Sequence, residues 1–453
     1  MFSSELDRAQ SPLSSRSRGI VLGSLLMLAV TASLVSARTL AVTYWAVAAG
    51  FLLAALWRGA INFSQLRPGA VASCLGTFLL YAMLSASWAV EPAIALTKAA
   101  VALAVGAGTL LMALTLVGET RSNLLHMGEG VCVGLCVGLS YLWIELLTDQ
   151  GVKLWLFRAL ELRPQDFNSP SNFTWDGTKL ISIAKDGLTR NIAPTVLFLW
   201  PALLTIKGAG RSSWHFAGAT LLVLLTTAVV MTAAHESSKL ALVVSLGAFG
   251  VALVSRRWAG RLVMLAWVLA CLAVVPVVLL AHRLDLQNAS YLQKSARHRI
   301  VIWNFTAEKM LESPWVGTGA NMTYVLGPAL ERAAPPVPGE SLPRTLSIHS
   351  HSIYLQTWFE LGVVGASLLT LVGLFILRAI RGLTPQLQAY AYAAFSAAAA
   401  MAATSYGMWQ FWFMALFGLC ALLFWIGAGL LQTSEATSAN AFSTGKVRAG
   451  GRR

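Results

Sequence analysis

Residues 20–36 read IVLGSLLMLAVTASLVS, a run of apolar and small side chains without a single charge. A helix needs about 20 such residues to cross the hydrocarbon core of a bilayer. Similar runs recur as far as Gln432, and 57% of the 453 residues are hydrophobic whereas 11% are charged. Soluble domains carry about 25% charged residues. The sequence therefore predicts an all-α integral membrane protein, whose first run is a retained helix rather than a cleaved signal peptide because further spans follow at once.

The apolar runs divide the chain into a short N-terminal tail (1–19), a polytopic membrane domain (20–432) and a C-terminal tail (433–453) that we predict to be disordered and basic. We predict about twelve transmembrane helices. They cover approximately residues 20–36, 40–57, 70–88, 94–117, 124–147, 191–206, 214–234, 240–255, 262–281, 353–377, 385–405 and 408–432.

Cationic residues orient these helices. With a cytoplasmic N-terminus, the inner segments contain 17 Lys and Arg residues, whereas the short outer turns contain only Arg38 and Lys239. Because inner loops of membrane proteins are enriched in Lys and Arg, both termini are predicted to be cytoplasmic. Two long loops, about 148–190 and 282–352, are then periplasmic, and the active site is expected there. The net charge of +14 is explained by topology, so we expect membrane lipids and no nucleic acid as partners.

Common cofactor and metal motifs are missing from the sequence. It contains no GxxxxGK[ST], no HExxH and no CxxC pair, and the acidic residues of the two loops form no DxD or DDxxD group. The five cysteines all fall inside predicted spans. We therefore predict neither a cofactor nor a metal site.

The stretch 350–365, SHSIYLQTWFELGVVG, leads from the second loop into a span. His351 is expected at the outer end of that helix, where the positive end of the helix dipole favours neutral imidazole, a possible general base. From position alone, a helix cap or an interfacial polar residue is the simpler interpretation, and the residues that follow His351 shift the balance toward function. Tyr354, Gln356 and Glu360 follow as possible walls of a site, and Glu360 is notable because an ionisable residue inside a span is costly.

A second stretch, RHRIVIW at 297–303, precedes the turn SPWVGTG at 313–319. Apolar residues at helical spacing predict an amphipathic helix lying on the bilayer surface. On this helix Arg299 and Trp303 share one face, and Trp303 is a further possible wall of the site. Arg297 and Arg299 are candidates for binding a diphosphate, and the alternative is that they hold the helix to lipid headgroups.

Two further candidates lie elsewhere in the predicted outer segments. Arg190 ends the first loop at the mouth of the sixth helix, where its planar guanidinium suits a diphosphate, although a single arginine at a loop end is commonly an interfacial anchor. His235 lies in a polar outer turn and is a possible wall of the site.

With these residues in view, the chain resembles the O-antigen ligase family, within a wider group that includes O-antigen polymerases and bacterial protein O-oligosaccharyltransferases. The resemblance covers most spans in number and order. Its specific part comprises Arg299 with Trp303, the turn Pro314-x-x-Gly317-x-Gly319, and the stretch from His351 to Gly365.

The resemblance implies transfer of a glycan from undecaprenyl diphosphate to a sugar hydroxyl of lipid A-core, at the periplasmic face of a Gram-negative inner membrane, with inversion and without a metal. His351 matches the family's essential histidine, and Arg299 and Arg190 match its essential arginines. The family histidine is commonly followed by Asn, but Ser352 follows here, so His349 is an alternative match.

Other functions remain open. An O-antigen polymerase or a protein O-oligosaccharyltransferase would use the same donor. A lipid-linked glycan transporter is a more distant alternative, because transporter sites lie near the bilayer midplane and often between internal repeats, neither of which the sequence indicates.

Overall fold

The computed structural model describes residues 12–58, 69–163, 173–177, 179–210, 212–333 and 345–449. Within these residues the regular structure is almost entirely helical, and the one sheet is a two-stranded antiparallel hairpin. The predicted all-α membrane class is confirmed, because ten helices of the described chain are long and apolar enough to cross a bilayer. These are α1 (Pro12–Val35), α2 (Leu40–Trp57), α3 (Ala70–Leu84), α4 (Pro92–Thr115), α5 (Arg121–Leu147), α7 (Thr189–Ala209), α8 (Ser213–Thr232), α9 (Glu236–Val254), α14 (Ile353–Arg381) and α16 (Phe411–Ala449).

The remaining two predicted spans differ from simple membrane helices. Residues 262–281 belong to α10 (Arg256–Leu272) and α11 (Val274–Arg283), which are bent by 70° relative to each other and would count as an eleventh span only if taken together. Pro276 has no backbone N–H to continue the hydrogen bonding of α10, which explains a break at this point. The last, α15 (Pro385–Thr404), is helical but not among the apolar spans, since it is rich in Ala, Gln and Tyr.

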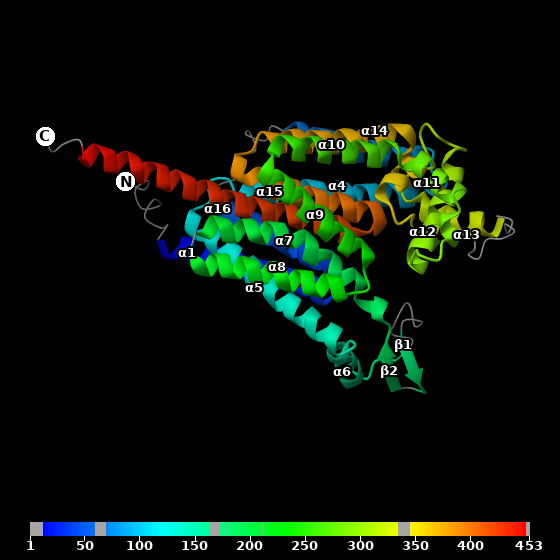
Figure 1. Cartoon of the computed structure of the whole chain (residues 1–453), viewed down its shortest axis with the longest axis horizontal. Coiled ribbons are helices and arrows are strands. Elements are labelled where there is room, and N and C mark those ends of the chain that lie inside the picture. The colour runs from blue at the N-terminus through cyan, green and yellow to red at the C-terminus, as the bar shows by residue number, and fades with distance from the viewer. Residues whose placement is uncertain are drawn as a thin grey trace, which may run out of the picture. The chain divides into compact units, whose positions relative to one another are not determined.

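Both long loops contain secondary structure. The first forms α6 (Gly151–Ala159), the strands β1 (Phe173–Asp176) and β2 (Lys179–Ile183), and the short helix η7 (Lys185–Leu188). Figure 1 shows α6 and the hairpin at the end of α5. Arg158 fastens α6 to β2 by donating to the carbonyls of Leu180 and Ile181, at 2.7 and 3.1 Å. The second loop forms α12 (Lys294–Met310) and α13 (Met322–Ala333).

The chain forms two compact units. The first unit comprises Met1–Asn62, Leu111–Leu242 and Leu416–Arg453, and the second unit comprises Phe63–Leu110 and Val243–Ala415.

In the first unit, α1 and α5 are the most closely packed helices. A Cβ atom added to Gly130 would lie 2.0 Å from the carbonyl oxygen of Gly23, so only glycine permits this approach. Glu119, whose side chain is 2% exposed, is neutralised by Arg18 at 3.3 Å and Arg58 at 3.0 Å. These contacts fix the start of α5 against the ends of α1 and α2.

In the second unit, α11, α12 and α14 share an apolar core that includes Val278, Phe305, Met310, Leu355 and Phe359. The predicted amphipathic helix is therefore present as α12, but its apolar stripe is largely buried within the protein. Ile300, Ala307 and Met310 are all less than 10% exposed, and only Leu311 is widely exposed at 57%. The stripe is used mainly to dock α12 onto α14, rather than to contact lipid as the sequence suggested.

The last helix, α16, extends into the C-terminal tail. The structure continues α16 through residues 433–449, where the Ser/Ala/Gly-rich composition predicted disorder. Ala is the strongest helix former, and a helix already begun adds residues cooperatively, so a long apolar helix can extend into a polar tail.

Candidate active site

The segment before α14 carries the candidate base. Ser352 caps the helix, and its side chain accepts from the backbone N–H of Leu355. His351, directly before the cap, has a left-handed backbone with a φ of 55°. A non-glycine residue in this region costs about 1–3 kcal/mol and persists only where surrounding contacts hold it.

Two contacts hold His351. Its Nδ1 lies 2.9 Å from the carbonyl oxygen of Ser405, and its backbone N–H donates to Nδ1 of His349 at 3.2 Å. A carbonyl only accepts hydrogen bonds, so Nδ1 of His351 carries the proton and the lone pair of the neutral ring is on Nε2. The backbone of the loop after α15 thus selects the tautomer whose Nε2 is basic.

His351 is neutral at physiological pH. Its pKa is lowered to about 4, mainly by burial of the ring. The hydrogen bond with Ser405 opposes this shift, and the charges of Arg299 and His298 add to it. This shift favours the neutral imidazole that a general base requires, and burial is its first cause.

His349 packs behind His351. The two rings meet edge to face with centroids 4.2 Å apart, and His349 is 6% exposed. A Cβ on Gly407 would lie 2.7 Å from Cβ of His349, so the loop between α15 and α16 closes over this histidine. His349 supports the backbone of His351, a role that suits a positioning residue better than a base.

The helix α12 brings cations to the same region. Trp303 donates from Nε1 to the carbonyl of Ser350 at 2.8 Å, which ties α12 to the histidine segment. Arg299, one turn earlier, is partly buried and electrostatically lowers the pKa of His351. Nε of Arg297 is buried without a hydrogen-bond partner among the described residues. His298 lies between them, and its pKa is lowered by burial and by Lys294 and Arg299.

Glu360 is fully buried and accepts hydrogen bonds from five donors. Oε1 accepts from the Thr323 hydroxyl at 2.6 Å, from the Thr323 N–H at 3.1 Å and from Nε2 of Gln356 at 3.0 Å. Oε2 accepts from the Asn321 N–H at 2.9 Å and from Nε1 of Trp409. This carboxylate therefore joins α14 to the turn after α12 and to the loop after α15, which makes it a structural anchor.

Gln356 and Tyr354 also make contacts within the second unit. Oε1 of Gln356 accepts from the backbone N–H of Met408 at 3.0 Å. The Tyr354 hydroxyl donates to the carbonyl of Ala399 at 3.0 Å, and its ring meets Trp267 edge to face. Both side chains hold α14 against the elements that carry Ser405 and thus support the histidine segment.

The two glycine motifs of the sequence meet at a break in α14. Gly362 has a φ of 63°, which interrupts the helix and exposes carbonyls. The backbone N–H groups of Thr318 and Gly319 donate to the carbonyls of Phe359 and Glu360, at 3.1 and 2.7 Å. In return, the N–H of Val363 donates to the carbonyl of Pro314 at 2.8 Å. The Pro-x-x-Gly-x-Gly turn and the Glu-x-Gly-x-x-Gly stretch are one interlocked feature.

Arg190 and His235 belong to the first unit. Arg190 is the second residue of α7 and partly buried, and its neighbour Asn191 donates to the carbonyl of Val35 at 2.6 Å, fixing the first turn of α7. His235, in the turn between α8 and α9, is 6% exposed, and its Nδ1 lies 2.6 Å from the hydroxyl of Ser238 in the first turn of α9.

The structure thus groups His351, His349, Arg299 and Trp303 in the second unit, with Tyr354, Gln356 and Glu360 packed behind them. Sequence reasoning missed Ser405, whose backbone carbonyl carries no sequence signal, and His298, which is visible in the sequence between two arginines. A neutral imidazole with a fixed basic Nε2 beside a guanidinium can remove a proton next to a bound anion.

The chain is similar to known proteins over part of its length. Residues 220–370 match the family model described as O-Antigen ligase, and this segment contains every predicted site residue except Arg190. A protein of Rickettsia conorii named "Putative polysaccharide ligase" is 28% identical over 237 residues, covering 50% of this chain and 54% of that protein. A protein of the same description from Rickettsia prowazekii is 33% identical over 145 residues, covering 31% of this chain and 35% of its own length. The chain spans about half or less of these relatives.

Proposed function

We propose, on the premise that residues 220–370 form an O-antigen ligase domain, that the protein is a glycosyltransferase acting at the periplasmic face of a Gram-negative inner membrane. It moves an O-antigen glycan from undecaprenyl diphosphate to a sugar hydroxyl of lipid A-core. The observation that carries this proposal is the hydrogen bond from Nδ1 of His351 to the Ser405 carbonyl, because it leaves Nε2 available as the base.

The transfer is a single displacement at the anomeric carbon of the donor. The acceptor oxygen forms the new bond to this carbon while its proton passes to Nε2 of His351, and the bond between the carbon and the diphosphate oxygen breaks. Attack opposite the leaving group inverts the anomeric configuration. The displaced undecaprenyl diphosphate carries the bonding electrons away.

The leaving diphosphate requires fixed positive charge. We assign this role to Arg299 and Arg297, since guanidinium forms paired charge-assisted bonds with phosphate oxygens, and the family resemblance adds Arg190 as a further candidate. Preorganised cations stabilise charge that develops in the transition state, which is the role that Mg²⁺ has in many enzymes acting on diphosphates. In this proposal the reaction proceeds without a divalent metal.

The test uses the purified protein in excess EDTA, with lipid-linked glycan as donor and three acceptors in separate reactions. Transfer to lipid A-core supports the ligase. Transfer only to a second lipid-linked glycan would identify a polymerase, and transfer only to protein would identify an O-oligosaccharyltransferase. Activity that requires added Mg²⁺ or Mn²⁺ would reject the arginine mechanism. Movement of labelled donor across sealed vesicles without transfer would indicate a transporter.

A further inference from the structure

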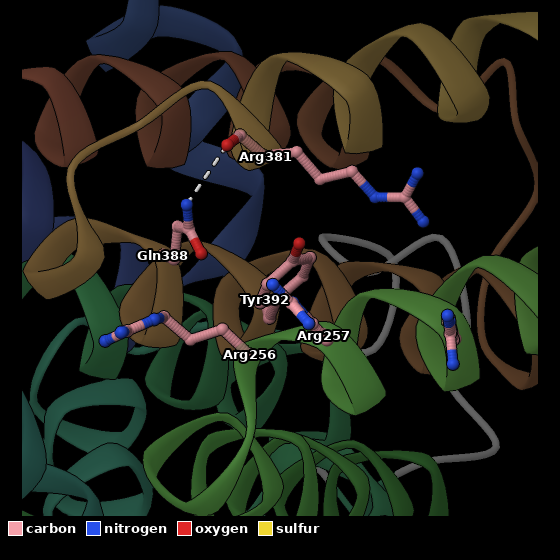
Figure 2. A pocket seen from close by; sticks show the side chains of 6 residues that line it. Arg256, Arg257, Arg381, Gln388 and Tyr392 are labelled. Atoms are coloured by element: carbon pink, nitrogen blue, oxygen red, sulfur yellow. Dashed lines mark hydrogen bonds between the residues drawn. The ribbon is translucent and has the colours of Figure 1, made fainter.

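Four arginines surround a cavity in the second unit, at the end of α14 opposite to His351. Arg256, Arg257 and Arg261 come from the first two turns of α10, and Arg381 is the last residue of α14. Together with Gln388 and Tyr392 of α15 they line a cavity of about 350 Å³ (Figure 2). This volume falls within the range of about 300–1,000 Å³ that is typical of small-molecule sites.

The positive charge of this cavity is not balanced by nearby acids. The stretches that form its walls, residues 243–284 and 361–434, contain no Asp or Glu. Among the described residues, no ion pair involves any of the four arginines, and the Arg381 guanidinium is 3.7 Å from the sulfur of Met264, a weak acceptor. Clustered like charges repel, so the arrangement favours an anion that bridges them.

The walls of the cavity are well ordered by packing. Nε2 of Gln388 donates to the backbone carbonyls of Arg381 and Leu383, at 3.1 and 2.9 Å, and so fixes the end of α14 (Figure 2 shows the first bond). A Cβ on Gly260 would lie 2.7 Å from the Tyr392 hydroxyl, so α10 and α15 approach closely at this point. The guanidinium groups are thus carried on two helices, α10 and α14, which contacts with α15 hold in position.

Next to the charged cavity, α10 exposes an apolar stripe. Leu262, Leu265 and Leu269 are 50–55% exposed. Trp258, 57% exposed, lies under the Arg261 guanidinium at 5.2 Å, and tryptophan is common at the boundary between hydrocarbon and headgroups. A ligand that contacts both the arginines and the apolar stripe has a phosphate head and a long apolar body.

We propose that this cavity binds the phosphate headgroup of an anionic phospholipid, whose acyl chains lie along the leucine stripe of α10. Basic pockets between membrane helices are suited to such headgroups. A planar guanidinium fork can donate two parallel hydrogen bonds to phosphate oxygens, which an ammonium cannot do. Free inorganic phosphate would use the arginines but not the leucines. The site is separate from the proposed transfer site, because Arg381 ends α14 and His351 precedes its start.

Native mass spectrometry of the full-length protein in detergent micelles tests this proposal. Cardiolipin, phosphatidylglycerol and zwitterionic phosphatidylethanolamine are added separately. We expect retention of cardiolipin and phosphatidylglycerol in preference to phosphatidylethanolamine. Arg261→Gln and Arg381→Gln should each weaken binding of the anionic lipids by about tenfold, which corresponds to the loss of one charge-assisted hydrogen bond. The matched control is Arg378→Gln, an exposed arginine one turn earlier in α14 that does not line the cavity, and it should bind normally.

Arg261→Lys and Arg381→Lys control for misfolding of the Gln variants, because they keep the positive charge and lose only the planar fork. Binding intermediate between the native protein and the Gln variants is expected. Equal lipid binding by all variants would overturn the proposal, as would equal retention of phosphatidylethanolamine. Stabilisation of the protein against heat by inorganic phosphate to the same extent as by anionic lipid would instead identify a site for soluble anions and would also overturn it.

Discussion

At the scale of single residues, His351 combines an uncommon backbone conformation with a fixed side chain. Its left-handed φ points the ring toward the loop after α15, where the carbonyl of Ser405 accepts from Nδ1. Strained conformations of this kind are frequent at functional sites because they fix a side chain in a productive orientation. The free energy needed to hold His351 is supplied by packing that includes His349 and Gly407.

Replacing His351 by Ala should reduce transfer by about 10²–10⁴-fold, the usual effect of losing a general base. His349→Ala should have a milder effect, since it removes support for the backbone of His351 but leaves the base. Initial rates with lipid-linked donor and core acceptor measure both effects, with membrane insertion as the control for folding. A larger loss for His349→Ala would assign the base to His349.

The lowered pKa of His351 predicts the pH dependence of the reaction. The base acts in its neutral form, so kcat/KM should stay constant between about pH 5 and 8 and fall only as the pH drops through about 4. A histidine in water would lose activity below its usual pKa of about 6.5. A profile of kcat/KM against pH distinguishes a buried from a solvated histidine. A loss of activity centred near pH 6.5 would show that burial does not lower the pKa of His351.

Arg190→Lys and Arg299→Lys should each retain expression and lose most of the transfer activity. An ammonium group keeps the charge but cannot form the two parallel bonds that a guanidinium offers a phosphate. Steady-state kinetics with varied donor concentration provides the measurement. Arg297→Lys serves as a comparison, and full activity in the Lys variants at 190 and 299 would reduce these arginines to plain electrostatic anchors.

At the scale of elements, the break in α14 determines how the second loop meets the membrane helices. Gly362 exposes carbonyls that the turn at 314–319 satisfies, and Glu360 accepts from the next residues along that turn. An ionisable residue within a span suggested function. Its five donors instead indicate that the carboxylate stabilises the junction on which the histidine segment rests.

A left-handed alanine costs about 1–2 kcal/mol relative to glycine. Gly362→Ala should destabilise the protein by more than this amount, because the added Cβ would also lie 2.3 Å from the Trp315 carbonyl oxygen. Gly250→Ala in α9 is the matched control, since nothing lies within 4 Å of its added Cβ. Thermal unfolding of the two purified variants in detergent gives the comparison. Equal melting temperatures would contradict the role assigned to the break.

The sequence predicted where the helices lie along the chain better than it predicted which residues they contact. Apolar runs specified the location of the spans, because every backbone group in a bilayer must be satisfied within the helix. It did not reveal the bend between α10 and α11, since Pro276 lies inside a continuous apolar run. Nor did it reveal that Ile300 and Met310 face protein, because an apolar stripe at helical spacing suits lipid and a protein core equally.

The candidate site was predictable where a side chain carries the chemistry. His351, Arg299 and Trp303 have distinctive types and spacing, and the structure groups them. The acceptor that sets the tautomer of His351 is a backbone carbonyl, 54 residues away at Ser405, and every residue has such a group. Its role therefore depends on tertiary structure alone.

At the scale of the whole molecule, the charge distribution predicts that both long loops are periplasmic. In a background with all five native cysteines replaced by Ala, Thr174→Cys and Ser295→Cys should react with an impermeant thiol reagent added to the periplasmic side. Gln386→Cys, in the first turn of α15, should react only after the membrane is opened. Protection of either loop position in intact cells would refute the predicted topology.

The interlock between residues 314–319 and the break in α14 has a consequence for biosynthesis. The hydroxyl of Thr318 and the carbonyl of Phe359, which it contacts, are separated by 41 residues, so the turn leaves the ribosome before its partner exists. On the predicted topology, the second loop therefore cannot reach its final form while it crosses the membrane. It must remain open until α14 has been inserted, and the histidine segment, which lies between the two halves, is completed only when they close together. A nascent chain arrested before residue 365 should thus expose this loop to protease, and release of the arrest should protect it.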